Sequence, residues 1–208
     1  TQAKTLFPYT TLFRSLAIDN VPLLIDAGVG TYTKKTFSSE RYTIWTMQSY
    51  YHNLPIINGQ PESFGTQYHA TQVRADEKRC IFTADIAKAY PEEAAVDSWI
   101  RAYQLQKNRL VITDDYRLKM KKAPNQLNFM TWGNVDISEK GRIKLHINKV
   151  KATLSYDANV FKPTVEAVEL TDQRLSKVWG DRIYRITLTA NDQALSGQYR
   201  CTVTRDNP

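Results

Sequence analysis

The chain has 208 residues, of which 42% are hydrophobic and 24% are charged, values that are ordinary for a folded globular protein. No run approaches the roughly 18 apolar residues that a membrane-spanning helix needs, so no membrane span is expected. The formal net charge of +7 favours polyanionic partners such as nucleic acid, anionic lipid or acidic polysaccharide, although a solvated basic surface explains the same charge equally well.

Residues 5–15, TLFPYTTLFRS, fit neither the helix period nor the strand period, and they lack the layout of a signal peptide. Back-translated, this stretch matches one reading frame of a widely used short-read sequencing adapter. We therefore interpret residues 1–15 as a non-native leader, a cloning or assembly artefact. The alternative is a hydrophobic hairpin, because threonine and aromatic residues favour strands.

From residue 16 onward the sequence reads as strand after strand. One short helical stretch is expected at residues 87–99, where Pro91 suits a first helical turn. Many short strands at regular spacing predict an all-β fold, a large antiparallel β-sandwich that occupies residues 16–208. Alternation or short apolar runs predict these strands at residues 20–32, 41–48, 68–75, 78–86, 98–106, 109–116, 126–133, 141–150, 151–157, 181–190 and 197–205.

The cysteines and the clustered basic residues bear on cellular location and on the type of partner. Cys80 and Cys201 could pair in an oxidising compartment or remain two free thiols, so they do not decide the location. Basic residues cluster only at 119–122 and 144–151, without the interleaved aromatic residues of a single-strand binder, so nucleic acid is not the expected partner.

Residues 25–59 carry the most specific pattern in the chain. An Asp-Ala-Gly turn is followed by a tyrosine, an aromatic stretch, and then Ser-x-x-His-Asn-x-Pro before Asn-Gly. This pattern resembles the C-terminal β-sandwich module of the heparinase II/III family of polysaccharide lyases. The resemblance extends over residues 20–204, with one departure at Glu62, where the family pattern has glutamine.

Asp26 and His52 are the candidate metal ligands. A carboxylate in a glycine-rich turn and an imidazole beside the next strand can converge on a divalent ion, and Zn²⁺ suits this donor pair. Two ligands are too few; the resemblance implies a zinc ion held also by an upstream histidine that this chain lacks. The alternative is that Asp26 caps its own turn and His52 is structural.

The resemblance also implies candidate catalytic and substrate-binding residues. Family lyases cleave a glycosidic bond at a uronic acid by β-elimination, in which histidine and tyrosine serve as base and acid. His52 and Tyr42 are the catalytic candidates, and Asn53 and Tyr32 are the substrate-binding candidates. Asn53 could instead orient the His52 ring, and each tyrosine could be a buried core aromatic. Tyr50 and Tyr51 lie in the same segment as further candidates, and Asn58 reads more simply as part of a hairpin turn. His69 and His146 stand alone on other strand patterns and read more simply as structural histidines.

The sequence therefore predicts a fragment of a lyase for acidic, uronic-acid-containing glycans such as glycosaminoglycan or alginate. We expect it to be inactive alone, because the resemblance implies an N-terminal helical toroid domain that is missing from this chain. A non-catalytic carbohydrate-binding or scaffold sandwich is the alternative. The resemblance implies a periplasmic, cell-surface or secreted bacterial location.

Overall fold

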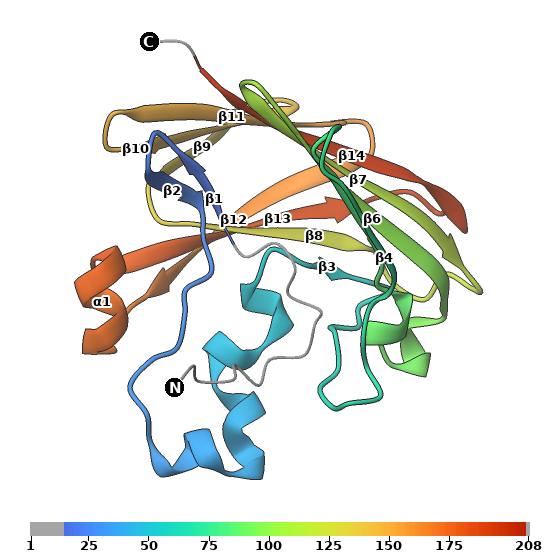
Figure 1. Ribbon diagram of the computed structural model, residues 1–208, viewed down its shortest axis with the longest axis horizontal. Helices are drawn as coiled ribbons and strands as arrows, with labels where there is room; N and C mark the ends of the chain where they lie inside the picture. The colour runs from blue at the N-terminus through green and yellow to red at the C-terminus, as the bar shows by residue number, and fades with distance from the viewer. Residues whose placement is uncertain (1–14, 207–208) are drawn as a thin grey trace.

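The structure is a computed structural model that describes residues 15–206, so nearly all of the leader expected at residues 1–15 lies outside the described part. Two antiparallel sheets pack face to face (Figure 1). The prediction of an all-β antiparallel sandwich is confirmed. No helix in residues 15–206 is long and apolar enough to cross a membrane.

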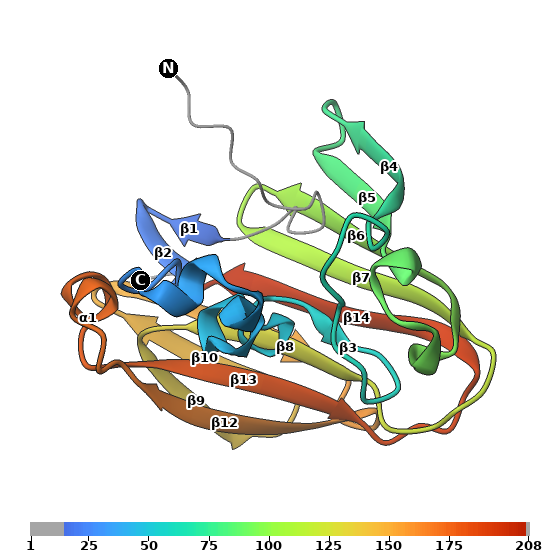
Figure 2. The ribbon, with the colours of Figure 1, turned by 90° about the horizontal axis from the view of Figure 1, so that it is seen from below.

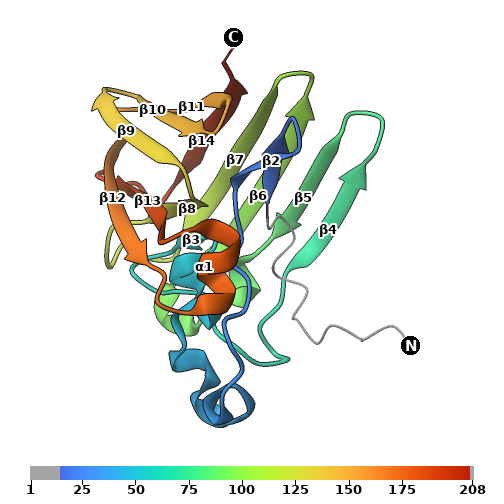
Figure 3. The same cartoon turned by 90° about the vertical axis from the view of Figure 1, so that its left-hand side faces the viewer.

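The larger sheet has eight strands in the order β4-β5-β6-β7-β14-β11-β10-β9. It curls so that its β9 edge approaches β12 of the smaller sheet (Figure 3). The bounds in that order are β4 (Thr71–Asp76), β5 (Ile81–Asp85), β6 (Val96–Gln106), β7 (Arg109–Leu118), β14 (Ser196–Arg205), β11 (Val150–Tyr156), β10 (Arg142–Ile147) and β9 (Asn134–Glu139).

The smaller sheet has four strands in the order β12-β13-β8-β3, and a separate two-stranded ribbon joins β1 to β2. The helix α1 (Gln173–Trp179) lies between β12 and β13 in the chain. The bounds of the strands are β12 (Phe161–Glu169), β13 (Arg182–Ala190), β8 (Gln126–Thr131), β3 (Pro55–Ile56), β1 (Leu16–Ile18) and β2 (Val21–Leu24).

Alternating side chains of the two sheets form the core. Trp99 of β6 and Phe129 of β8 are both almost completely buried between the layers. Three rings from different strands stack there, with centroids 5.3 Å apart for Trp99 and Tyr116 and 4.6 Å apart for Tyr116 and Tyr199. Each fully buried large apolar side chain stabilises the fold by about 1.5–3 kcal/mol, so this interface holds the two sheets together.

The strand predicted at residues 41–48 is wrong. This segment belongs to a series of short 3₁₀ helices, which lies beside β8 on one side of the sandwich (Figures 1 and 2). Serine and threonine side chains bond the backbone locally and so compete with strand pairing: Ser38 Oγ accepts from Glu40 N, and Thr43 Oγ1 donates to Glu40 O. The helices are η1 (Lys34–Phe37), η2 (Ser39–Thr43), η3 (Trp45–Met47) and η4 (Ser49–Tyr51).

The helical prediction for residues 87–99 is correct only in part. Two 3₁₀ turns form, η5 (Ala87–Ala89) and η6 (Glu92–Ala94), and Pro91 precedes the second turn instead of lying inside it. Ala95 then adopts φ 46°, which ends the turn and lets β6 begin at the next residue.

Both cysteines are free thiols. Cys80 is exposed, whereas Cys201 is buried in the core. Burial raises the pKa of the Cys201 thiol to about 12, so this side chain behaves as a small apolar group.

Candidate functional site

His52 and Asp26 lie side by side, although 25 residues separate them in the sequence. His52 Nδ1 is 3.3 Å from Asp26 Oδ2, and each side chain is 18% exposed. Asp26 follows the end of β2, and His52 ends η4. His52 is therefore the cap of a 3₁₀ helix that lies beside β8, and the long strand expected before it is absent from this segment.

The turn at Asp26 explains how its carboxylate points toward the histidine. Asp26 Oδ1 accepts a hydrogen bond from the Gly28 backbone N–H at 2.9 Å. Gly28 has φ 80°, a conformation that favours glycine. One carboxylate oxygen therefore caps the local turn, as the structural alternative required, while the other oxygen faces His52.

The Asn53 side chain links the backbone beside Asp26 to strand β8 of the smaller sheet. Its Nδ2 donates to the Ile25 carbonyl at 3.1 Å, and its Oδ1 accepts from the Met130 N–H at 2.8 Å. The Ile25 N–H in turn donates to the Met130 carbonyl at 2.9 Å. The residue before Asp26, the residue after His52 and strand β8 are thus joined in one hydrogen-bonded ring.

The chemistry of the pair suits a divalent metal, but it supplies only part of a coordination shell. Nδ1 of His52 is buried and makes no hydrogen bond within the described residues, and a carboxylate oxygen lies beside it. No group of three or more His, Cys, Asp or Glu side chains in residues 15–206 could hold a metal ion. Asp26 and His52 fit two positions of a tetrahedral zinc site, and further ligands would have to come from elsewhere.

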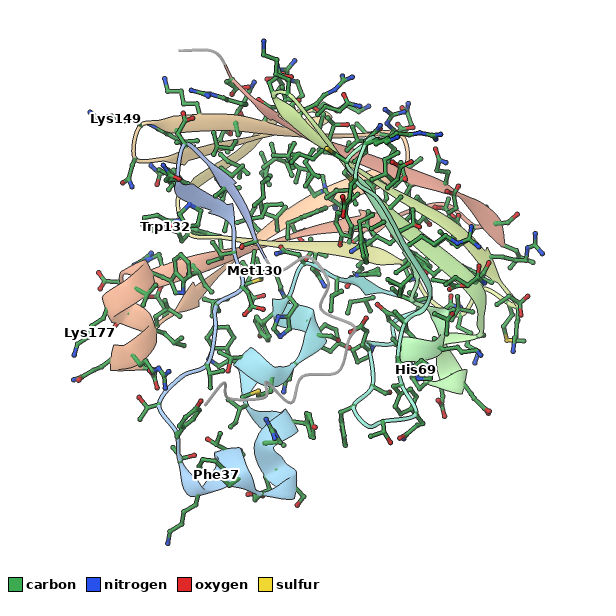
Figure 4. All side chains as sticks on the ribbon, viewed as in Figure 1. Phe37, His69, Met130, Trp132, Lys149 and Lys177 are labelled. Carbon is green, nitrogen blue, oxygen red and sulfur yellow. The ribbon has the colours of Figure 1, made fainter. Side chains whose placement is uncertain are left out.

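Tyr32 and Tyr42 are exposed, which is not the environment of a buried core aromatic. Tyr42 stacks on Phe64, with ring centroids 3.8 Å apart, and Tyr32 meets the edge of Phe37 at 5.7 Å. The Arg174 guanidinium of α1 lies 5.2 Å from the centre of the Tyr32 ring. Figure 4 shows Phe37 at the outer end of the 3₁₀ segment, away from Met130 of β8. Met130 is the residue whose N–H bonds the Asn53 side chain.

These rings make up the exposed aromatic cluster, which we define as Tyr32, Phe37, Tyr42 and Phe64. Within residues 15–206 all the exposed aromatic side chains belong to it, and Phe37 and Phe64 are 79% and 59% exposed. Sequence reasoning missed both phenylalanines, because a single aromatic in a polar stretch reads as a core residue. Cationic side chains in or beside the same segment are Lys34, Lys35, Arg41 and Arg174.

Glu62 is the most perturbed carboxylate in the part of the chain that the structure describes. Burial raises its pKa to about 8, against the opposing effect of the Arg101 charge. Its Oε1 atom is buried and has no hydrogen-bond partner among residues 15–206. A carboxyl in this setting is largely protonated at neutral pH, and a protonated carboxyl can donate a hydrogen bond as a glutamine amide does.

The remaining candidates have structural surroundings. Asn58 is buried, and its Nδ2 donates to the carbonyls of Ala94 and Met120 at 2.7 and 2.9 Å. His69 is exposed in the segment before β4 and is far from Met130 in Figure 4, and His146 is exposed on β10. Neither histidine lies at the His52–Asp26 pair. Tyr51 packs against Trp45 and lies under Arg185, with centroid distances of 5.2 and 4.8 Å.

Comparison with solved structures shows that this fold resembles part of several heparan sulfate lyase and heparinase III structures. The heparan sulfate lyase HepC from Pedobacter heparinus has a TM-score of 0.67 and 13% sequence identity, over 93% of this chain and 30% of its own. A heparinase III has a TM-score of 0.63 and 15% identity, over 91% of this chain and 28% of its own. No protein-family model and no curated protein matches the sequence. This chain therefore has the β-sandwich fold found in these lyases and spans about 30% of their length.

Proposed function

We propose that this chain is the β-sandwich module of a polysaccharide lyase that cleaves acidic, uronic-acid-containing glycans by β-elimination. The observation that carries the proposal is the His52–Asp26 pair, with its 3.3 Å contact, on a sandwich that resembles heparan sulfate lyases over 93% of this chain. The exposed aromatic cluster, three of whose rings lie on the chain between Asp26 and His52, and the net charge of +7 add support.

β-Elimination needs one group to remove the proton beside the uronic-acid carboxylate and another to protonate the leaving oxygen. The C–H and C–O bonds break, and a carbon–carbon double bond forms. Because Nδ1 of His52 faces Asp26, Nε2 is the nitrogen left for proton transfer with the sugar. Tyr42 is the candidate for the second group, and Asn53 and Tyr32 are candidates for substrate contacts.

In its competing role, His52 is a metal ligand together with Asp26, and Zn²⁺ is the metal that we propose for the pair. Asp26 and His52 would hold it, and the ion would fix the turn after β2 against the end of η4 and polarise an oxygen bound to it. We expect weak affinity, because only these two ligands lie within residues 15–206.

An acidic glycan suits the exposed surface of the segment that joins Asp26 to His52. Sugar rings present apolar C–H faces that pack on exposed aromatic rings, and the cluster offers four such rings. Arginine and lysine side chains pair with carboxylates and sulfates, and those in or beside the segment are Lys34, Lys35, Arg41 and Arg174. A glycosaminoglycan is the best-supported substrate class, and alginate is a second acidic possibility.

The whole reaction is assigned to a longer protein. This chain spans about 30% of the lyases that it resembles, and we propose that a helical toroid domain supplies the rest of the active site. We also propose a periplasmic, cell-surface or secreted location, where acidic polysaccharides are accessible.

The test is a lyase assay, in which the unsaturated uronate product is followed by its ultraviolet absorbance with heparin, heparan sulfate, hyaluronan and alginate. We expect no turnover by this chain alone and turnover by a form that includes the helical domain. A His52→Gln variant of the longer form should lose activity, whereas His146→Gln should not. Failure of the longer form on every acidic glycan would overturn the lyase assignment.

A non-catalytic carbohydrate-binding module is the second candidate. The observation in its favour is that Tyr32 and Tyr42 contact other aromatic rings of the exposed cluster. This alternative predicts glycan binding by the longer form without any product formation, which the same assay combined with calorimetry separates.

A further inference from the structure

We propose that Arg101 is a positioning residue, which holds His52 against Asp26 through its buried contacts with Asp114 and with the backbone of Asn53. This inference rests on the proposed function only in treating the His52–Asp26 pair as the site. It concerns a residue on the larger sheet that does not touch the pair directly.

Arg101 and Asp114 form a buried, two-pronged ion pair. They face each other across β6 and β7. Arg101 Nε donates to Asp114 Oδ1 at 2.7 Å, and Nη2 donates to Asp114 Oδ2 at 2.8 Å. Trp99 Nε1 also donates to Asp114 Oδ1, at 2.6 Å. These bonds fix the plane of the guanidinium, because its donors form a rigid fork.

The remaining guanidinium nitrogen of Arg101 bonds the residue next to His52. Arg101 Nη1 donates to the Asn53 carbonyl at 3.0 Å. Asn53 follows His52 directly, and its side chain is bonded to Ile25 and Met130. The larger sheet therefore holds the backbone of Asn53 through Arg101, while the smaller sheet bonds its side chain through Met130. His52 is held where these two attachments meet.

Energetics favour a positioning role over a purely stabilising one. A buried ion pair is costly to desolvate, and well-packed apolar residues often replace it without loss of stability. Arg101 is only 3% exposed, so the desolvation of its charge opposes folding. Apolar residues at positions 101 and 114 could pack equally well, but they could not donate a hydrogen bond to the Asn53 carbonyl.

The surrounding groups keep Arg101 charged. Burial opposes the charge, but Asp114 and Tyr103 raise the pKa of Arg101 well above its ordinary value. Glu62 and Tyr90 also face this region, and their own pKa values are raised chiefly by burial. Arg101 thus remains a cationic donor over the whole pH range in which the fold persists.

The experiment uses the side-chain NMR signals of the three histidines, His52, His69 and His146. The ring ¹⁵N shifts of His52 report the surroundings of Nδ1, and the other two rings serve as internal controls in the same sample. Spectra are compared at one fixed pH for the parent chain, Arg101→Lys, Asp114→Asn and Asp26→Asn. Arg101→Lys keeps the charge, but a single ammonium cannot hold both Asp114 oxygens and the Asn53 carbonyl in one plane.

In Arg101→Lys we expect the His52 ring signals to move at least halfway toward those of Asp26→Asn, while those of His69 and His146 stay in place. Tyr199→Phe is the matched control, since it removes only a buried hydroxyl, bonded to Asp192 and Asn125, and keeps the ring that stacks on Tyr116. It should move none of the three rings. Unchanged His52 signals in a folded Arg101→Lys chain would overturn the proposal.

Asp114→Asn keeps the shape of the aspartate and serves as the second variant if Arg101→Lys does not fold. It should displace the same His52 signals, because it frees the guanidinium from its anchor. If neither variant folds, the pair is essential to the fold itself and the positioning role is rejected. Because no glycan is present, failure of the lyase assay leaves this result unaffected.

Discussion

Tyr42 and Phe64 stack with their ring centroids 3.8 Å apart and their planes 9° from parallel. Tyr42 belongs to η2, whereas Phe64 belongs to the segment that follows Glu62, so the stack joins two separate stretches of chain. Both rings nevertheless remain exposed. If this surface binds a sugar ring, as proposed above, the stack gives Tyr42 a role that does not need its hydroxyl group.

The first prediction separates the ring of Tyr42 from its hydroxyl. Tyr42→Phe should bind an acidic oligosaccharide within about twofold of the parent chain, since the stack with Phe64 is kept. Tyr42→Ala should weaken binding about fivefold, because an aromatic contact contributes about 1 kcal/mol. Isothermal titration calorimetry with a heparan sulfate oligosaccharide measures both.

Leu195→Ala is the matched control for that experiment, since Leu195 is exposed but lies outside the aromatic cluster. It should leave the affinity unchanged. Equal weakening by Tyr42→Phe and Tyr42→Ala would show that the hydroxyl matters for binding, and the stacking account would then be wrong.

The second prediction concerns metal binding at the His52–Asp26 pair. Asp26→Asn and His52→Gln should each weaken Zn²⁺ binding by at least about tenfold, because even residues that only orient metal ligands change affinity by about 10–100-fold. Competition with a chromophoric chelator measures the affinity. His146→Gln is the control, as His146 is exposed on β10. Identical affinities in all four proteins would mean that zinc binds elsewhere.

Strand positions could be read from the sequence where alternation and turn chemistry agree. Strand β7 alternates from Ile112 onward, with Ile112, Asp114 and Tyr116 buried, and the sequence predicted it. Residues 41–48 carry the same aromatic and β-branched composition, but the serines and threonines around them bond the backbone locally. Composition could not reveal that competition, so the predicted strand became two 3₁₀ helices.

Of the candidate site, the sequence predicted only the two residues of the pair. The motif pointed to Asp26 and His52, and the structure brings them together. Arg101 stands out as a charged residue at an inward position between Trp99 and Tyr103, but its partner Asn53 could not be anticipated, because 48 positions separate the two residues. Such a contact depends on how β6 packs against the smaller sheet. That is a property of the tertiary structure and not of any local pattern.

The third prediction is a change in stability with pH that depends on Glu62. Its pKa is about 8 in the folded chain and is near its ordinary value of 4.5 in the unfolded chain. Between these values the folded state holds a proton that the unfolded state has lost, so stability falls as the pH rises from about 4.5 to about 8. Glu62→Gln should abolish this part of the decline and should stabilise the chain at pH 8 more than at pH 5.

Urea unfolding of the parent chain and the variant at the two pH values provides the measurement. Glu93→Gln is the control, because Glu93 is exposed in η6 and should behave like the parent chain. A parent chain and a Glu62→Gln variant with parallel pH profiles would show that this carboxyl is not perturbed.

The fourth prediction compares a buried ion pair with an exposed one. Asp114→Asn should destabilise the fold by about 3–5 kcal/mol, since it leaves the buried Arg101 charge without its partner. Glu139→Gln, which breaks the half-exposed pair with Arg142, should cost no more than about 1 kcal/mol. Chemical unfolding at neutral pH measures both. The difference arises because water replaces a lost surface partner but cannot reach a guanidinium that is enclosed between two sheets. Comparable losses for the two variants would therefore mean that solvent reaches Arg101, and the rigid attachment of Asn53 to the larger sheet would no longer follow.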